Sequence, residues 1–200
     1  MVAFREAKCD DTRGSKLPSL GTKLSSPNQR FKGEVMKKEV VFPDKGLEYV
    51  IRKAIDNPKD PIYTFSLEDA ITLEAPEQSI SDLTGLECCL NLQELYLFVN
   101  NISNISPLAG LNNLKTLYLY INNISDISPL AGLSNLQWLA LWDNNISDIS
   151  PLAGLNNLQE LWLSENIISD ISALAGLSNL WRLAIWDNNI SDILPLVDNA

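Results

Sequence analysis

A 22-residue repeat constrains what this chain can fold into more than any other feature. From Leu92 onward the framework LxxLxLxxNxIxxIxxLxxL recurs every 22 residues in five regular copies, and a degenerate copy with Gln78 at the asparagine position precedes them. One copy cannot bury its own leucines, so successive copies are expected to stack into a continuous apolar core. The repeat predicts a solenoid of similar coils rather than a domain built around one compact centre.

Within each copy the LxLxx segment alternates with a period of two, which predicts a short strand with its leucines pointing inward. Stacked copies then form a parallel sheet. An asparagine closes each strand segment and is expected to bond the backbone of its turn, one rung per copy: Asn100, Asn122, Asn144, Asn166 and Asn188.

The segment S-P-L-A-G-L follows in three of the copies and predicts a short helical turn, with serine at the N-cap and proline at the first helical position. The aspartate column that precedes it, represented by Asp126, Asp148 and Asp170, is expected to lie in solvent beside backbone donors. No oxygen-rich loop of the calcium type accompanies the column, so we expect no metal site.

This pattern resembles the leucine-rich repeat family, in the 22-residue form of bacterial internalins, through segments such as NNISDISPLAGLSNLQWLALWDN at 122–144. The resemblance extends from about Pro43 to the end of the chain. It implies an α/β solenoid, a right-handed superhelix with a parallel β-sheet on the concave face and short 3-10 or helical turns on the convex face. It also implies a non-catalytic recognition protein that is secreted or displayed on a bacterial surface.

The chain divides by composition into three parts. Residues 1–40 show no apolar period and predict a flexible basic arm, whereas 41–70 contain apolar residues at helical spacing after Asp44, which predict a helical N-terminal cap. Residues 71–200 form the solenoid, whose last copy is incomplete and uncapped. We expect either that the chain is a fragment or that its open end pairs with another molecule, a second copy included.

Charge and composition exclude several functions. The chain has no histidine, which removes serine–histidine and cysteine–histidine nucleophiles and imidazole-ligated zinc. Residues 61–200 hold 16 acidic and 2 basic side chains, so we expect no nucleic-acid ligand for the solenoid. Neither a signal peptide, a membrane span nor a wall-anchoring tail is recognised, and the compartment is left open. Three cysteines imply no disulfide framework.

Function is expected on the outward positions that flank the strand leucines, because the frame repeats while these positions vary. Aromatic residues gather there, beside an acidic column, and an exposed aromatic stripe is typical of a binding surface. Ala140 should lie in a small aromatic-walled depression. We expect a protein partner with a basic and partly apolar surface. The candidate partner-binding residues are Tyr96, Phe98, Tyr118, Tyr120, Trp138, Ala140, Trp142, Asp143, Glu160, Trp162, Glu165, Arg182, Trp186 and Asp187.

Two other functions compete with protein binding. The same aromatic stripe could stack on sugar rings, which makes a carbohydrate-binding module the alternative. Catalysis would need a carboxylate pair such as Glu160 with Asp143 or Glu165. An open, solvated face gives little reason for one carboxyl to stay protonated, so we expect no enzyme activity and no cofactor.

Overall fold

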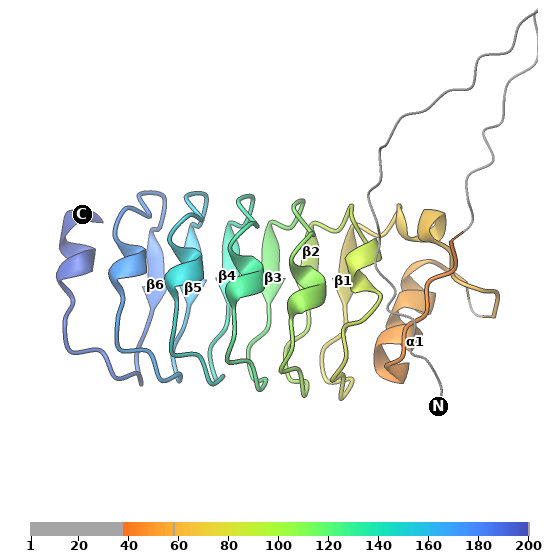
Figure 1. Cartoon of the computed structure of the whole chain (residues 1–200), viewed down its shortest axis with the longest axis horizontal. Coiled ribbons are helices and arrows are strands. Elements are labelled where there is room, and N and C mark those ends of the chain that lie inside the picture. Colours follow the sequence, from red (N-terminus) through yellow and green to blue (C-terminus); the bar gives the residue numbers. More distant parts are fainter. Residues whose placement is uncertain (1–37, 58, 200) are drawn as a thin grey trace, which may run out of the picture.

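The computed structural model describes residues 38–57 and 59–199, and the flexible arm expected at 1–40 lies almost wholly outside them. Each repeat makes one coil of a solenoid, and the coils follow one another in chain order from β1 to the C-terminus (Figure 1). One parallel sheet runs along the solenoid in the order of the sequence. Its strands are β1 (Thr72–Glu74), β2 (Glu94–Tyr96), β3 (Thr116–Tyr118), β4 (Trp138–Ala140), β5 (Glu160–Trp162) and β6 (Arg182–Ala184).

The register of the sheet confirms the column alignment of the repeats. Leu73 pairs with Leu95, Leu95 with Leu117, and the same step of 22 residues continues through β6. The leucines of these strands face the interior, where the described residues form one hydrophobic cluster that runs unbroken from Val40 to Leu177. Burial of each leucine contributes about 2 kcal/mol to stability. An isolated repeat would leave its leucines exposed to water and would lack this contribution.

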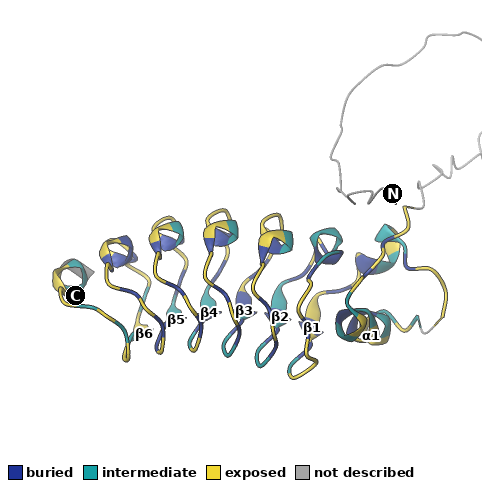
Figure 2. Cartoon of the chain, turned by 60° about the horizontal axis from the view of Figure 1, so that its bottom comes forward, coloured by how far each residue is buried: buried dark blue, intermediate teal, exposed yellow. Residues whose placement is uncertain are grey.

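Short 3-10 helices form the opposite, convex side, where they spread apart while the strands draw together (Figure 2). They are η2 (Leu86–Cys88), η3 (Ser106–Leu108), η4 (Ser128–Leu130), η5 (Ser150–Leu152), η6 (Ser172–Leu174) and η7 (Leu194–Asn199).

The capping of these turns differs from the prediction. The serine N-cap is wrong: Ser128 is the first residue of η4, and its own N–H donates to Asp126 Oδ1 over 2.8 Å. The same bond joins Ser150 to Asp148. The aspartate column therefore supplies the cap through a side-chain turn two residues long. These backbone donors, together with the serine hydroxyl, lower the pKa of Asp126 and Asp148 from the ordinary value of 3.8.

The asparagine ladder is confirmed. Asn144 Nδ2 donates to the carbonyl oxygens of Leu119, one repeat earlier, and Leu141, both over 3.1 Å. Its Oδ1 accepts the N–H of Ile124 over 2.9 Å. Because every rung joins two coils in this way, the buried turn backbone finds its partners without water.

A second asparagine ladder runs along the exposed part of the coils and was not anticipated from the sequence. Asn135 Nδ2 donates to the Asn112 carbonyl oxygen, and Asn157 Nδ2 donates to that of Ser134, each over 2.8 Å. Asn91, Asn113 and Asn179 make the equivalent bond. The column was visible as the asparagine in GLNNL and GLSNL, but nothing in its spacing distinguishes a bonded surface asparagine from a solvated one.

Helix α1 (Lys45–Ala54) packs beside β1 at the N-terminal end of the solenoid (Figure 1). Leu47 and Ile51 are fully buried, as their spacing predicted, whereas Ala54 is exposed. The N-cap is Asp44, which accepts from Leu47 N over 3.1 Å through one oxygen and from Ser81 N over 2.9 Å through the other. Burial alone would raise the pKa of Asp44, but the backbone N–H groups outweigh it and the pKa is lowered.

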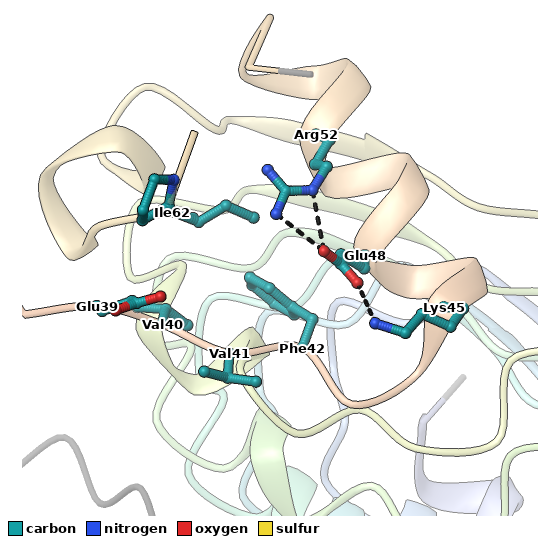
Figure 3. Close-up of a pocket in the computed structure, with 9 residues that line it drawn as sticks. Glu39, Val40, Val41, Phe42, Lys45, Glu48, Arg52 and Ile62 are labelled. Atoms are coloured by element: carbon teal, nitrogen blue, oxygen red, sulfur yellow. Dashed lines mark hydrogen bonds and ion pairs between the residues drawn. The ribbon is translucent and has the colours of Figure 1, made fainter. Parts of the chain in front are cut away.

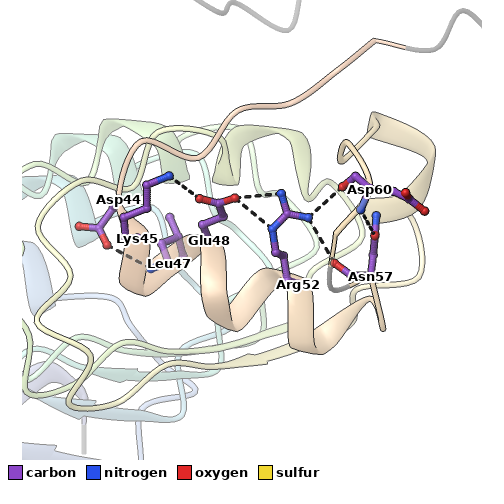
Figure 4. A network of polar contacts seen from close by, with 7 residues as sticks. All are labelled: Asp44, Lys45, Leu47, Glu48, Arg52, Asn57 and Asp60. Atoms are coloured by element: carbon purple, nitrogen blue, oxygen red, sulfur yellow. Dashed lines mark hydrogen bonds and ion pairs between the residues drawn. The ribbon is translucent and has the colours of Figure 1, made fainter.

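An ion-pair chain lies along α1 (Figure 4). Lys45 Nζ and Arg52 Nη2 lie 2.7 and 2.9 Å from the two carboxylate oxygens of Glu48. Arg52 Nη1 also donates to the carbonyl oxygens of Asn57 and Asp60, which holds the segment after the helix against it. The Arg52 guanidinium is therefore engaged within the chain.

The described residues include no helix long and apolar enough to cross a membrane.

Candidate functional site

The concave face consists of the outward-facing residues of each strand. It also includes the residue that directly follows the second leucine of each LxL segment. In β2 and β5 the middle leucine is buried while the two flanking residues are partly exposed. The candidate residues named from the sequence therefore share one surface. The structure shows how they are arranged on it, and it shows contacts among them that the sequence did not predict.

Ala140 lies in the middle of this face, paired with Tyr118 on one side and with Trp162 on the other. It is only 5% exposed, so the larger neighbours stand above it. Trp162 pairs in turn with Ala184, which is partly exposed. The small residue and its aromatic neighbours are placed as the repeat register predicted.

Three aromatic rings form a stack along the face. The ring of Tyr120 lies between those of Phe98 and Trp142, with centroids 4.6 Å away on each side and planes inclined by 9° and 11°. Tyr96 and Tyr118 pack edge to face beside this stack, with centroids 5.2 Å apart. Stacked and edge-to-face pairs of this kind each contribute about 1 kcal/mol beyond their burial. The sequence placed these rings on one face but did not show that they pack on one another.

The stack stops at Ser164. Backbone bonds from Asp143 N to Ser164 O and from Glu165 N to Trp186 O place Trp142, Ser164 and Trp186 on successive rungs. Ser164 is 2% exposed, whereas Trp186 is 57% exposed. The same column thus holds three packed rings, a buried serine and a loosely packed ring.

Arg182 occupies part of the surface that was expected to receive a partner's cation. Its guanidinium carbon lies 4.4 Å from the centroid of the Trp162 ring, and its Nη1 lies 3.7 Å from Glu160 Oε2. One face of Trp162 and one candidate carboxylate are therefore already engaged by the chain's own cation. A partner's cation at Trp162 would have to displace this arginine.

An exposed acidic column borders the face: Asp143, Glu165 and Asp187. All three have left-handed backbone, with φ of 54°, 54° and 51°. The equivalent positions Val99 and Ile121 have φ of 56° and 55°, a conformation that is costly for β-branched residues. The sequence carried no signal for this strain, because the column lacks the glycine that usually marks it.

The tyrosines of the face stay neutral at physiological pH. Burial and the neighbouring Glu94 raise the pKa of Tyr96, and its hydroxyl donates to Glu94 Oε2 over 3.2 Å. Burial and Glu160 raise the pKa of Tyr118. Burial, followed by Tyr118, raises that of Tyr120. The phenol groups of Tyr118 and Tyr120 can therefore donate hydrogen bonds to a ligand, whereas that of Tyr96 already donates to Glu94.

Two small hollows lie toward the N-terminal end and were missed from the sequence. One, of about 110 Å³, is lined by Glu74, Pro76, Tyr96 and Phe98 at the end of the aromatic face. The other, of about 130 Å³, lies between the segment around Val40 and helix α1, beside Glu48 and Arg52 (Figure 3). Both are smaller than the pockets that hold drug-sized ligands.

Metal chemistry finds no support in the part of the chain that the structure describes. There, no three acidic or cysteine side chains come together as a metal site would require. Cys89 is buried, and burial together with Glu87 raises the pKa of its thiol to about 12. A thiol of this kind is a core residue rather than a nucleophile.

Comparison with known proteins gives concordant results. A family model described as leucine-rich repeats in two copies matches residues 90–132 and 134–176. An internalin of Listeria monocytogenes, InlF, is 35% identical, with a TM-score of 0.77, and the match covers 79% of this chain and 47% of InlF. The chain thus spans about half the length of that relative.

Two more distant structures share the fold. A leucine-rich repeat protein of Leptospira interrogans is 27% identical, with a TM-score of 0.55, over 63% of this chain and 33% of its own. The functional domain of InlJ from Listeria monocytogenes is 21% identical, with a TM-score of 0.54, over 79% of this chain and 44% of its own. A comparison with curated protein sequences gives no match.

Proposed function

We propose, from the premise that this chain belongs to the internalin-like leucine-rich repeat family, that it is a non-catalytic scaffold that binds a protein partner through its concave face. Leucine-rich repeat proteins generally act in protein–protein interaction. The observation that carries the choice of face is the aromatic stack of Phe98, Tyr120 and Trp142, which holds large rings at an outward surface.

The stack supports binding because it is ordered before any partner arrives. Aromatic residues dominate the binding energy of protein interfaces when they are held in fixed positions, since little side-chain entropy is then lost on association. Each ring of the stack is fixed by its neighbours and by a strand or turn of the solenoid. The frame below repeats almost unchanged, so a change in the outward residues alters recognition without altering the fold.

The charge of the face indicates the partner's chemistry. Asp143, Glu165 and Asp187 are exposed along one border of the stack, and Glu160 lies beside Trp162. A complementary surface would present basic groups at its rim and apolar groups at its centre. We therefore expect a basic, partly apolar protein surface as the partner.

The aromatic rings also leave a glycan as the competing ligand, although both faces of Tyr120 and one face each of Phe98 and Trp142 are covered by neighbouring rings. Only Trp186 and Trp181 among the tryptophans are largely exposed. A sugar ring needs a free aromatic face to stack on. Protein binding uses ring edges and the charged border as well, and it is the better fit to a stack in which both faces of Tyr120 are already covered.

Capture with a matched variant tests the proposal. The immobilised chain and its Trp138, Trp142 and Trp162 triple alanine variant are incubated with candidate lysates and with a glycan array, and circular dichroism verifies that both are folded. We expect a protein that is captured by the wild type only and whose binding weakens as salt is raised, because rim charges are screened. Equal capture by both proteins would contradict the concave-face proposal, and salt-independent binding to neutral glycans would favour the carbohydrate alternative.

A further inference from the structure

The interruption of the aromatic stack at Ser164 has features of a ligand position that side chains cover in the free chain. Tyr120 covers one face of Trp142, so the other face of the Trp142 indole looks toward the next rung, which is that of Ser164. No ring stands at that rung. The observed ring spacing of 4.6 Å matches the strand spacing of about 4.8 Å, so each rung of the column holds one ring-sized layer.

The far wall of this position is Trp186. It stands one rung beyond Ser164 and two beyond Trp142. Two rung spacings of about 4.8 Å equal the thickness that one planar group needs between two parallel rings. Trp186 is 57% exposed, unlike the packed rings of the stack. It is therefore the wall that can move at the smallest cost in packing.

Ser164 itself lacks what a buried hydroxyl requires. Among the buried side-chain nitrogen and oxygen atoms that the structure describes, only the Oγ of Ser164 has no hydrogen-bond partner. Leaving a buried hydroxyl unpaired destabilises the free protein, and native structures keep such groups rarely. Because Ser164 is 2% exposed, neighbouring side chains cover it in the free chain, and a ligand reaches it by displacing the loosest of them.

The charges around this position select the ligand. Asp143, Glu165 and Asp187 directly follow Trp142, Ser164 and Trp186 in the chain, and all three carboxylate residues are exposed. The surface already shows how it holds a guanidinium: Arg182 lies over Trp162 at 4.4 Å and is paired with Glu160. A planar cation with several N–H donors fits the two indoles, the hydroxyl and the acidic border at once.

We infer that the Ser164 position is an arginine-binding slot for a protein partner. Trp186 moves outward to admit the guanidinium of a partner's arginine, which then stacks between Trp186 and the free face of Trp142, and one of its N–H groups donates to Ser164 Oγ. The acidic column lies at the mouth of the slot and attracts the incoming cation. The inference rests on the proposed function, since it names the group by which a protein partner is held on the concave face.

Peptide titration of the full chain tests the slot directly. The probe is a capped Gly-Gly-Arg-Gly-Gly peptide, with the lysine equivalent as its comparison, and the readout is the set of indole N–H signals in nitrogen–proton correlation spectra. We expect the arginine peptide to shift the Trp142 and Trp186 signals saturably, and the lysine peptide to bind more weakly because an ammonium does not stack. Unmoved Trp142 and Trp186 signals would overturn the slot.

Ser164→Ala separates a ligand-binding hydroxyl from a structural one. Removal of an unpaired buried hydroxyl is expected to raise the Tm of the free chain, while loss of the acceptor weakens the arginine peptide about tenfold. Ser134→Ala, on an exposed convex turn, serves as the control and should change neither quantity. A lower Tm with unchanged peptide affinity would make Ser164 structural and would overturn the slot.

Ser164→Phe continues the stack and closes the slot. It should abolish the peptide shifts in a chain whose circular dichroism shows it to be folded, and persistent shifts would contradict the assignment. Failure of the slot and failure of the proposed function are distinguishable. A partner that is lost in the tryptophan triple variant but retained by Ser164→Phe would leave concave-face binding in place and remove the arginine slot alone.

Discussion

The ring of Tyr120 stacks on the ring of Trp142 with their centroids 4.6 Å apart and their planes 11° apart. These residues belong to adjacent repeats, 22 positions apart in sequence, and Ile121 N bonds Trp142 O beside them over 3.0 Å. The solenoid's own spacing, about 4.8 Å between strands, therefore sets the stacking distance. A recognition surface built in this way is ordered by the frame and not by its ligand.

The asparagine ladder is expected to carry a large share of the stability. Asn144→Ala removes bonds to Leu119, Leu141 and Ile124 in a buried place, which should lower the free energy of unfolding by about 3 kcal/mol. Urea unfolding followed by circular dichroism measures the loss. Asn145→Ala is the control, because Asn145 directly follows Asn144 and is exposed. It should lower the free energy of unfolding by less than about 0.5 kcal/mol. Equal losses in both variants would contradict the structural role of the ladder.

Backbone strain at the rim predicts a stabilising substitution. Ile121 is β-branched and has a φ of 55°, whereas Asp143 occupies the same position in the next repeat with a φ of 54°. Asparagine tolerates this conformation, so Ile121→Asn should raise the free energy of unfolding by about 1 kcal/mol. Asp143→Asn is the control, because aspartate is not β-branched and no strain of that kind is removed. It should change the free energy of unfolding by less than about 0.5 kcal/mol. A destabilised Ile121→Asn chain would show that packing of the isoleucine outweighs the strain.

The capping aspartates predict a pH dependence of defined sign. Backbone N–H groups lower the pKa of Asp126, Asp148 and Asp170 from 3.8, so the stabilisation is present above that value and is lost as pH falls through the lowered pKa. The triple asparagine variant keeps the acceptor oxygen, as Asn104 does for Ser106 N over 2.9 Å, but cannot titrate.

Urea midpoints measured from about pH 6 to about pH 2.5 test this dependence. The wild type should lose more stability below pH 3.8 than the triple variant does. Parallel curves for the two proteins would show that these caps do not titrate with folding.

The buried thiol predicts resistance to alkylation. Burial and Glu87 raise the pKa of Cys89 to about 12, so almost no thiolate forms at neutral pH. Iodoacetamide should leave Cys89 unmodified in the folded chain and modify it once urea has unfolded the protein, with the site located by mass spectrometry. Rapid modification of Cys89 under native conditions would contradict its place in the core.

Repetition made most of the fold predictable. The strand leucines, the inner asparagine ladder and helix α1 all follow from residues whose environment recurs or whose spacing is periodic, and the structure confirms each of them. The turn caps were assigned to the wrong residue because serine and aspartate both cap helices, and only geometry shows that Asp126 accepts from Ser128. The three-part division of the chain stays a prediction.

The candidate site was predictable as a surface but not as a set of contacts. Alternation along a strand places Phe98, Tyr120 and Trp142 outward without saying whether their rings stack. Arg182 was named as a site residue, yet its position over Trp162 depends on a rotamer that no sequence pattern specifies. The unpaired hydroxyl of Ser164 likewise appears only once its neighbours have coordinates.

The repeated frame supplies most of the stability and the outward residues of the concave face determine binding, although loss of the Tyr120–Trp142 contact also lowers the stability somewhat. The most direct measurement compares the Trp138, Trp142 and Trp162 triple alanine variant with Asn144→Ala, recording for each the free energy of unfolding and the affinity for the captured protein partner below the unfolding transition. We expect the tryptophan variant to lose at least tenfold in affinity, and Asn144→Ala to lose stability while its folded fraction binds as the wild type does. A tryptophan variant that binds with unchanged affinity would contradict the account.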